Sequence, residues 1–386
     1  MLCLKQFTHK FGLDWGTMKL LIVANNLAGG GAEKVLLMLL EALKPPNYEI
    51  DLLLIKNKGV YMNALPQHVH LITMIDVNKT DRSFPSEPSV LKSYGHQLIR
   101  KDHDVEVAFL EGPPTKLVAY HETKARKIAW VHTDLMDAHW TYPYYESDQH
   151  ELAAYDRFDE IVFVSDSAKQ GFYRRFGRPA AHCSIITNPT DTVMIQQKAA
   201  RFSVPTYSFC FCSTASLNAR KGQSRLLHAI GRLFNEGYQF HLNLVGDGDA
   251  RCYYEELAHL LGISPYVHFL GFQCNPYPYM ANCDVFILPS LAEGFPLVLC
   301  ESLCLHRPII ATRCSGSQDV LQNGRFGMLT DNTEEGLYLG MKAVLDNPAL
   351  LSELEARSLL GAETLQYSAI IYRVQCLLHG KGNETI

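Results

Sequence analysis

The sequence predicts an α/β protein of two domains, each built on a parallel sheet that helices cover on both faces. Short apolar runs alternate with helical stretches along the chain, which is typical of parallel sheets. The same alternation begins again near Tyr207, so the second half repeats the pattern of the first. A length of 386 residues is long for one domain and suits two.

The first domain is predicted from residue 18 to residue 200. Its first strand is the apolar run 19–26, followed by a glycine turn and a helix that Pro45 and Pro46 end. Residues 1–17 precede this strand and are interpreted as an extension outside the fold. The remaining apolar runs predict strands at 49–56, 105–110, 127–131, 160–166 and 184–187, and helices at about 32–43, 115–122 and 167–176.

The second domain is predicted from residue 201 to residue 365, after a join near 191–205. Its strands are expected at 208–216, 240–246, 267–271, 284–289 and 308–312, with helices at 221–237, 254–262 and 277–283. A loop of small residues is expected at 314–317. The last apolar helix, 367–379, lies in a C-terminal segment from 366 to 386. The cleft between two such domains is the default ligand site.

Composition excludes several classes of protein. A net charge of −5 gives no reason to expect a nucleic-acid partner. Eleven scattered cysteines without a C-x-x-C pair resemble no disulfide framework, so reduced cytoplasm is the expected compartment. No apolar run reaches the roughly 18 residues that span a bilayer. The basic cluster Lys169, Arg174, Arg175 and Arg178 is either a solvated helix face or a contact with an anionic acceptor or with anionic lipid at the inner membrane surface.

Residues 293–301, EGFPLVLCE, place two glutamates eight positions apart after a buried strand. Pro296 fits the first turn of a helix, because its missing N–H is not needed there. On helical geometry Glu301 would lie about 12 Å beyond Glu293, turned by roughly 80°. A helix N-terminus attracts phosphate, so the layout suits a nucleotide sugar, with its diphosphate between sugar and ribose. The alternative is a capped surface helix with two solvated acids.

The segment 288–321, LPSLAEGFPLVLCESLCLHRPIIATRCSGSQDVL, closely resembles the donor site of retaining glycosyltransferases of family 4. These enzymes have the GT-B fold, two Rossmann-like domains facing a central cleft, with a C-terminal helix that crosses back to the first domain. The resemblance implies that Glu293 lies beside the donor sugar and that Glu301 holds the ribose hydroxyls. The other donor contacts it implies here are Gly294, Phe295, Pro296, Leu297 and Val298.

Residues 215–223, ASLNARKGQ, line up with the G-R-L-x-x-x-K-G signature of that family. The resemblance implies that Lys221 binds the donor diphosphate, where one ammonium would neutralise leaving-group charge. Ser216 stands where the family has an arginine. This departure removes one cation from the donor site, and Arg220 or another arginine is a candidate to replace it.

The turn Gly29-Gly30-Gly31 after the first strand resembles the GGAE opening of many family 4 enzymes. Gly30 and Gly31 are therefore expected near the donor phosphates and the acceptor, although a tight turn alone would explain them. The turn is not G-x-G-x-x-G, and no acid follows the second strand where a dinucleotide ribose would need it. These two facts argue against a nicotinamide site.

Two further strand ends carry candidate residues of the first domain. His132 follows the strand 127–131 at the edge that faces the cleft. Its position matches a family histidine beside the transferred sugar, while a hydrogen-bonded structural histidine is the alternative. Glu111 and Gly112 end another strand and are expected on the acceptor side.

Asp247-Gly248-Asp249 spells D-x-D, the metal-binding mark of the other large glycosyltransferase fold. It lies in a strand-to-helix turn, where Gly246 and Gly248 are expected to let the nucleotide base pack on backbone. No metal and no other cofactor is therefore predicted.

The preferred hypothesis is a retaining hexosyl- or N-acetylhexosaminyltransferase. It would move a sugar from a nucleoside diphosphate, a UDP-sugar in first place, to a hydroxyl of a surface glycan or lipid-linked oligosaccharide. Glu293, His132 and Lys221 are its predicted catalytic residues. Alternatives are a nucleotide-sugar epimerase or sugar phosphorylase of the same architecture, and a non-catalytic nucleotide-sugar-binding partner in a transferase complex.

Overall fold

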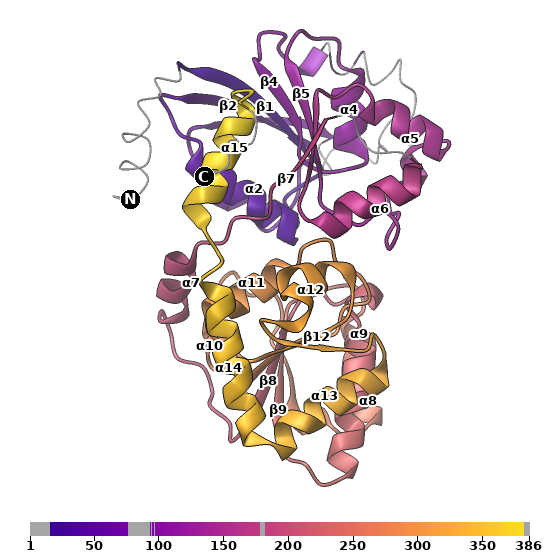
Figure 1. Ribbon diagram of the computed structural model, residues 1–386, viewed down its shortest axis with the longest axis vertical. Helices are drawn as coiled ribbons and strands as arrows, with labels where there is room; N and C mark the ends of the chain where they lie inside the picture. Colours follow the sequence, from indigo (N-terminus) through magenta and orange to yellow (C-terminus); the bar gives the residue numbers. More distant parts are fainter. Residues whose placement is uncertain (1–15, 76–92, 94, 96, 178–181, 382–386) are drawn as a thin grey trace. The chain divides into compact units, whose positions relative to one another are not determined.

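The computed structural model describes residues 16–75, 93, 95, 97–177 and 182–381, which form two compact units (Figure 1). One unit runs to Pro189 and takes up the segment from Ser368, and the other runs from Thr190 to Tyr367. Each unit contains one parallel sheet with helices, as the sequence predicts. Residues 1–15 of the expected N-terminal extension and Arg178 of the basic cluster lie outside the described residues.

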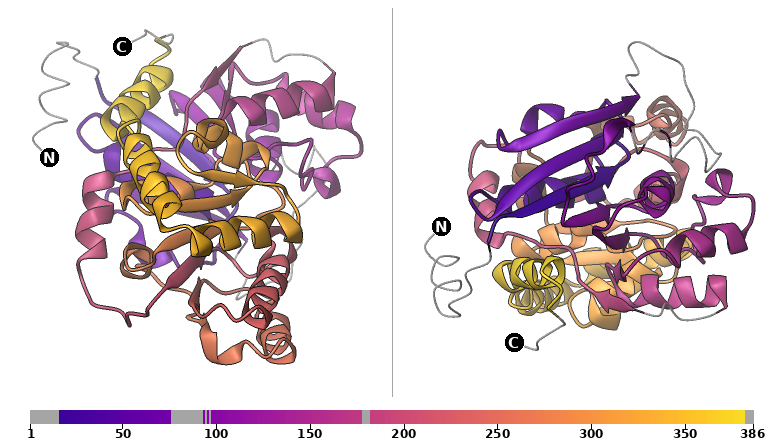
Figure 2. Two further views of the ribbon diagram at one scale, coloured as in Figure 1. Left: turned by 60° about the horizontal axis from the view of Figure 1, so that its bottom comes forward. Right: turned by 90° about the horizontal axis from the view of Figure 1, so that it is seen from above.

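The first unit is built on a seven-stranded parallel sheet of order β3-β2-β1-β4-β5-β6-β7. β1, β2 and β3 lie side by side at one end of this sheet (Figure 2). The order reverses between β1 and β4, so the loops that follow these strands begin on either side of a topological switch point. The strands are β1 (Met18–Ala24), β2 (Tyr48–Lys56), β3 (Val69–Ile75), β4 (Val105–Ala108), β5 (Arg126–Val131), β6 (Glu160–Phe163) and β7 (Cys183–Ile185).

The last helix, α15, belongs to the first unit although its sequence follows the second. Arg126 at the start of β5 donates to the carbonyl of Leu377, and Arg373 donates to the carbonyl of Ile185 in β7 at 2.5 Å. The helices of this unit are α2 (Gly31–Ala42), α4 (Pro113–Tyr120), α5 (Asp148–Tyr155), α6 (Asp166–Phe176) and α15 (Tyr367–Leu378), with 3₁₀ turns at Met62–Ala64 and Tyr142–Tyr144.

The second unit is built on a six-stranded parallel sheet of order β10-β9-β8-β11-β12-β13. Its order reverses between β8 and β11. Val285 and Ile287 of β11 join a core cluster on one face of the sheet, while Phe286 and Leu288 join the cluster on the other. Both faces are thus buried, which is why this strand reads as a continuous apolar run. The strands are β8 (Cys210–Thr214), β9 (His241–Val245), β10 (Val267–Phe269), β11 (Val285–Leu288), β12 (Ile309–Thr312) and β13 (Met328–Thr330).

The helices of the second unit supply the outer side of both core clusters, and most of them follow one of its strands. They are α7 (Thr192–Ala199), α8 (Gln223–Asn235), α9 (Arg251–Leu260), α10 (Tyr277–Ala281), α11 (Leu297–Cys304), α12 (Ser315–Val320), α13 (Glu334–Asp346) and α14 (Pro348–Ala362), with 3₁₀ turns at Ala219–Lys221, Ser264–Tyr266 and Gln322–Gly324.

Two details of the predicted donor segment need correction. The residues expected as a loop at 314–317 contain the start of α12, because Cys314 is its N-cap and the helix begins at Ser315. Pro296 is the N-cap of α11 rather than a residue of its first turn. Helical geometry therefore applies only from Leu297 onward, and the separation of about 12 Å expected between Glu293 and Glu301 does not follow, since Glu293 lies in the preceding loop.

Candidate functional site

The candidate donor residues of the second unit gather at the carboxyl edge of its sheet. Lys221 ends the 3₁₀ turn after β8, and Glu293 lies in the loop between β11 and α11. β8 and β11 are the neighbours between which the strand order reverses, and the loops at such a point diverge and leave room for a ligand. The topology thus brings together two residues that are 72 positions apart in the sequence.

Lys221 and Glu293 form a direct ion pair. The Lys221 ammonium donates to Oε1 of Glu293 at 2.6 Å, and the two side chains are 17% and 10% exposed. The hydroxyl of Ser290 donates to the same oxygen, also at 2.6 Å. This carboxylate and the cation beside it can be reached from solvent. The carboxylate can stabilise positive charge on a substrate while the cation stabilises negative charge.

The loop that carries Glu293 is held from the neighbouring helix α12. The N–H of Gly316 donates to the carbonyl of Glu293 at 3.0 Å, and the Ser315 hydroxyl donates to it at 3.2 Å. A Cβ at residue 316 would lie 2.6 Å from that carbonyl oxygen, so only glycine lets α12 come this close. The small residues interpreted as a loop in the sequence are therefore the contact that fixes the backbone of Glu293.

α11 begins directly after this loop with an N-cap, Pro296, that offers no side-chain hydrogen bond. Unpaired N–H groups of a first turn attract anions, as the sequence predicts for Leu297 and Val298. Glu301 lies in the second turn, only 3% exposed, and the Tyr277 hydroxyl donates to its Oε1 at 3.3 Å. The predicted contact of Glu301 with a ribose is untested; in the structure this carboxylate is a buried acceptor.

The glycines of the loop after β9 have a structural reason besides the predicted nucleotide contact. A Cβ at Gly246 would lie 1.9 Å from the carbonyl oxygen of Ala215, and one at Gly248 would lie 2.4 Å from that of Leu217. They let this loop pack on the backbone after β8. Asp247 uses Oδ1 to accept the Gly248 N–H at 2.8 Å, and within the described part of the chain no group of three or more His, Cys, Asp or Glu could hold a metal ion.

Ser216, at the position where the resembling family has arginine, is exposed, and its hydroxyl accepts a hydrogen bond from the Asn218 amide at 2.9 Å. Arg220 is exposed beside Lys221, and its carbonyl accepts the N–H of Leu291. Arg225 on α8 is half-buried and donates to the carbonyl of Pro289 at 2.6 Å. Arg225 is therefore committed to holding the β11 loop, while the side chain of Arg220 lies exposed next to Lys221 in the sequence.

In the first unit, the glycine turn follows β1 and leads directly into α2. Gly30 is the N-cap of this helix and Gly31 its first residue. A Cβ at Gly30 would lie 2.3 Å from the carboxylate of Glu33, which folds back onto the start of its own helix. Burial raises the pKa of Glu33. The predicted phosphate contact of Gly30 and Gly31 is untested. Glu33, the acid at this turn, was not among the predicted site residues.

Glu111 follows β4 and is completely buried. Its Oε2 accepts the backbone N–H of His132 at 2.9 Å, and its Oε1 accepts the indole N–H of Trp140 at 3.0 Å. Gly112 is the N-cap of α4, and its carbonyl accepts the Tyr145 hydroxyl. Glu111 was expected to line the acceptor side, which is untested; in the structure its carboxylate ties the chain after β5 to the end of β4.

His132 directly follows β5, as predicted, and packs against Phe109 with ring centroids 4.8 Å apart. Its Nε2 is buried and has no hydrogen-bond partner among the described residues. Burial lowers the pKa of His132 to about 4, against a smaller opposing effect of Glu111. The imidazole is therefore neutral at ordinary pH. Depending on the tautomer, its unpaired nitrogen can donate a hydrogen bond to a hydroxyl or accept one from it.

We expect this shift to make the first unit less stable in acid. Unfolding returns His132 to its ordinary pKa of 6.5, so between about pH 4 and pH 6.5 the unfolded chain binds more protons than the folded one. The free energy of unfolding should therefore rise with pH across this window, and His132→Gln should reduce the slope. Urea unfolding followed by tryptophan fluorescence reports this unit, because Trp130 and Trp140 lie in it.

His259→Gln, at an exposed position on α9 in the other unit, is the matched control and should leave the slope unchanged. An equal slope in the wild type and in His132→Gln would show that His132 is charged in the folded chain.

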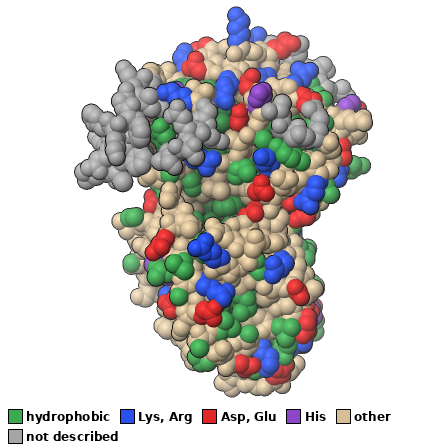
Figure 3. All heavy atoms as spheres, in the orientation of Figure 1, with side chains coloured by type: hydrophobic (Ala, Val, Ile, Leu, Met, Phe, Trp, Pro, Cys, Tyr) green, Lys and Arg blue, Asp and Glu red, His purple; other side chains and the backbone are tan. Residues whose placement is uncertain are grey.

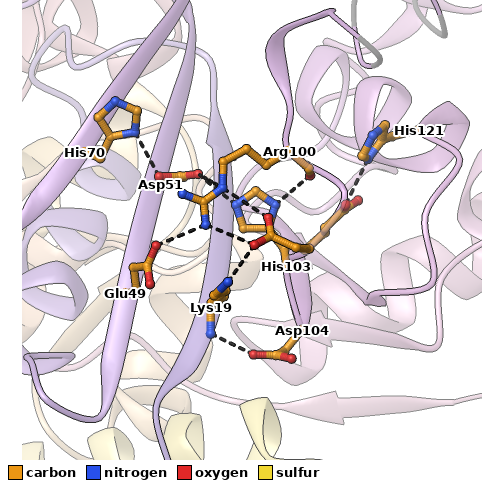
Figure 4. A network of polar contacts seen from close by, with 10 residues as sticks. Lys19, Glu49, Asp51, His70, Arg100, His103, Asp104 and His121 are labelled. Atoms are coloured by element: carbon orange, nitrogen blue, oxygen red, sulfur yellow. Dashed lines mark hydrogen bonds and ion pairs between the residues drawn. The ribbon is translucent and has the colours of Figure 1, made fainter.

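A second polar cluster lies at the opposite, amino-terminal part of the first sheet (Figure 4). Asp51 of β2 is buried and accepts hydrogen bonds from His70 at 2.9 Å and His103 at 2.8 Å. Burial is the largest single effect on the pKa of Asp51 and would raise it, but these two bonds together with the charges of His103 and Arg100 lower the pKa. The other ring nitrogen of His103 faces the carbonyl of Arg100.

The surface offers no large area of one charge on the face drawn in Figure 3, where acidic and basic side chains are interspersed. In the basic cluster on α6, Arg175 pairs with Asp148 at 2.7 Å, and Arg174 lies 3.8 Å from Asp134. Within the described ranges, no helix is long and apolar enough to cross a membrane.

Comparisons with known proteins identify relatives of this chain. Residues 207–347 match the family model of group 1 glycosyl transferases. A relative from Campylobacter jejuni, N-acetylgalactosamine-N,N'-diacetylbacillosaminyl-diphospho-undecaprenol 4-alpha-N-acetylgalactosaminyltransferase, is 28% identical over 354 residues, 86% of this chain and 91% of that protein. The lipopolysaccharide core biosynthesis glycosyltransferase LpsE of Rhizobium meliloti is 31% identical over 183 residues, 47% of this chain and about half (52%) of LpsE.

Among solved structures, HepE of Anabaena in complex with UDP and glucose superposes with a TM-score of 0.78 at 19% identity, over 94% of this chain and 99% of HepE. At this identity the likeness establishes the fold, which is GT-B. Fold and sequence matches together define the class of protein, a glycosyltransferase. More narrowly, residues 207–347 carry the likeness to group 1 glycosyl transferases, and one of the relatives is named for lipopolysaccharide core biosynthesis.

Proposed function

We propose that this enzyme is a retaining glycosyltransferase that takes its sugar from a nucleoside diphosphate sugar, a UDP-sugar in first place. The observation that carries the proposal is the 2.6 Å contact between Lys221 and Glu293 at the switch point of the second sheet. It places one cation and one carboxylate where loops and a helix N-terminus converge. That combination suits a donor whose leaving group gains negative charge while its sugar gains positive charge.

Lys221 and the first-turn N–H groups of α11 would bind and stabilise the departing diphosphate. Glu293 would orient the sugar and stabilise the positive charge that develops on it. The loop contact with Gly316 holds the Glu293 backbone in place before the donor arrives, so little reorganisation remains for the reaction. No protein base is assigned, because the departing diphosphate can itself take the acceptor proton. His132 stays a predicted contact of the sugar hydroxyls.

The relatives support a glycan or lipid-linked acceptor. The Campylobacter jejuni enzyme is named for transfer to an undecaprenyl diphosphate-linked sugar, and LpsE is named for lipopolysaccharide core biosynthesis. A hydroxyl of such an acceptor is the one we propose here, with transfer of a hexosyl or N-acetylhexosaminyl group at the cytoplasmic side of a membrane. The reported relatives are named transferases, and the epimerase alternative gains no support from them.

A thermal-shift panel of nucleoside diphosphates and their sugars tests the donor. A ligand at a hundred times its Kd stabilises the folded state by about 2.7 kcal/mol, which raises the melting temperature of a domain of this size by several degrees. UDP and one or more UDP-sugars should give this shift, and GDP should give none. If GDP alone gives it, the base is guanine; if no nucleotide gives it, the proposal is wrong.

We expect transfer to proceed without a divalent metal. Lys221 and the α11 amides already supply positive charge, while Asp247 is engaged with the Gly248 N–H and, at 3.4 Å, with Arg251. Activity should therefore stay within about twofold when EDTA is added in excess to metal-free buffer. Activity that is lost in EDTA and returns only with a divalent ion would contradict this expectation.

A further inference from the structure

We infer that Ser290 is a positioning residue that orients Glu293 for sugar transfer. The inference rests on the proposed function, because it takes Glu293 to act on the donor sugar. Ser290 lies three residues before Glu293 and is completely buried. Its hydroxyl donates to Oε1 of Glu293 at 2.6 Å, a length typical of the strong hydrogen bonds that hydroxyls give to carboxylates.

The neighbouring strand fixes the position of Ser290. Thr312, the buried last residue of β12, donates its hydroxyl hydrogen to the carbonyl of Ser290 at 2.5 Å and also lies 3.3 Å from the carbonyl of Leu288. β12 pairs with β11, from which the Ser290 loop emerges. The direction of the Ser290 hydroxyl is thus set by the sheet, and a site supported by regular elements holds its geometry better than one supported by loops.

Both side-chain donors to Glu293 in the described chain converge on one oxygen. Lys221 and Ser290 each donate to Oε1 at 2.6 Å. The carboxylate is therefore held at one end, and Oε2 is the oxygen left for the substrate. The two donors have different roles, because a bound diphosphate would attract the Lys221 ammonium away from Glu293. Ser290, uncharged and held from β12, is the donor that keeps Glu293 in its orientation once Lys221 has turned to the phosphates.

The test compares Ser290→Ala with Ser358→Ala. Ser358 is an equally buried serine on α14, and its hydroxyl has no hydrogen-bond partner among the described residues. Both changes remove one buried hydroxyl, but only the first frees Glu293. UDP release from the UDP-sugar found in the donor panel gives kcat and KM, and UDP titration gives binding. A carboxylate displaced by about 1 Å costs up to about a hundredfold in rate.

We expect Ser290→Ala to lower kcat tenfold or more, with KM and UDP affinity within about threefold, and Ser290→Thr to recover most of kcat. Ser358→Ala should leave kcat as it is. Equal kcat in Ser290→Ala and Ser358→Ala would overturn the inference, as would a loss in Ser290→Ala explained by a fall in UDP affinity. Should Ser290→Thr fold poorly, as its melting temperature would show, the split between kcat and KM in Ser290→Ala decides alone. Failure of the proposed function is a separate result: wild type would not turn over the donor, or Glu293→Ala would leave turnover unchanged.

Discussion

Replacing Glu293 by alanine should lower kcat by about a thousandfold while donor affinity changes little. The reason is that its carboxylate stabilises positive charge that exists on the sugar only in the transition state. In the structure Lys221 and Ser290 hold this carboxylate at Oε1. Steady-state UDP release from the donor sugar gives kcat and KM, and UDP titration checks that the site is intact.

Glu301 provides the contrast within the same motif. Because it is predicted to hold the ribose, Glu301→Ala should weaken donor binding more than tenfold and leave kcat within a few-fold. Glu301→Gln keeps the shape of this buried side chain and separates lost binding from lost stability. Negligible effects of both the Glu293 and the Glu301 changes would refute the donor site proposed for the second unit.

Replacing Lys221 by methionine should lower kcat/KM by about a hundredfold to a thousandfold, the usual cost of removing one stabilising donor from a developing anion. Methionine keeps much of the length and apolar stem of lysine but cannot pair with the diphosphate or with Glu293. Both UDP affinity and turnover should fall, because the ammonium meets phosphate in the ground state and in the transition state. The same UDP-release assay measures the effect.

Arg220→Met is the matched control, one residue away on the exposed side of the same turn. It should change kcat/KM by less than about threefold if Lys221 alone serves the diphosphate. A loss as large as that of Lys221→Met would show instead that Arg220 supplies the cation that Ser216 lacks. A harmless Lys221→Met would remove this lysine from the mechanism.

The fold was largely predictable from sequence because the inner strands of both sheets are buried on both faces and therefore read as apolar runs. The two strands that the sequence did not reveal, β3 and β13, lie at sheet edges. β3 is half-exposed along most of its length and interrupted by His70 and Thr73, and β13 has only three residues. An edge strand has one neighbour and needs less apolar surface, so its pattern is weak.

Several helices were also missing from the prediction, for two different reasons. α13 and α14 carry recognisable start signals, since the Thr333 hydroxyl caps the first and Asn347 with Pro348 opens the second. Residues 331–366 therefore contain sequence signals for both helices. α12 begins with Ser315 and Gly316, poor helix formers, and its glycine is explained only by the approach to the Glu293 carbonyl.

At the site, residue types and flanking sequence were enough to select Glu293 and Lys221. Their contact depends on β8 and β11 being neighbours, and no local pattern contains that information. Ser290 lies only three residues before Glu293, but it was not predicted, because the Thr312 contact that fixes its position depends on the pairing of β11 with β12. Glu111 was selected by its position at a strand end, and the internal hydrogen bonds that its buried carboxylate accepts could not be predicted from that position.

The place of α15 in the first unit has a consequence for synthesis of the chain. Its hydrogen bonds to β5 and β7 join residues made after the second unit to strands made before it. While the ribosome translates the continuous stretch Thr190–Tyr367, α15 has not yet been made, so β5 and β7 lack these hydrogen-bond partners. The second unit can thus finish folding as a nascent domain before the first does, the reverse of the order in which translation of the two begins.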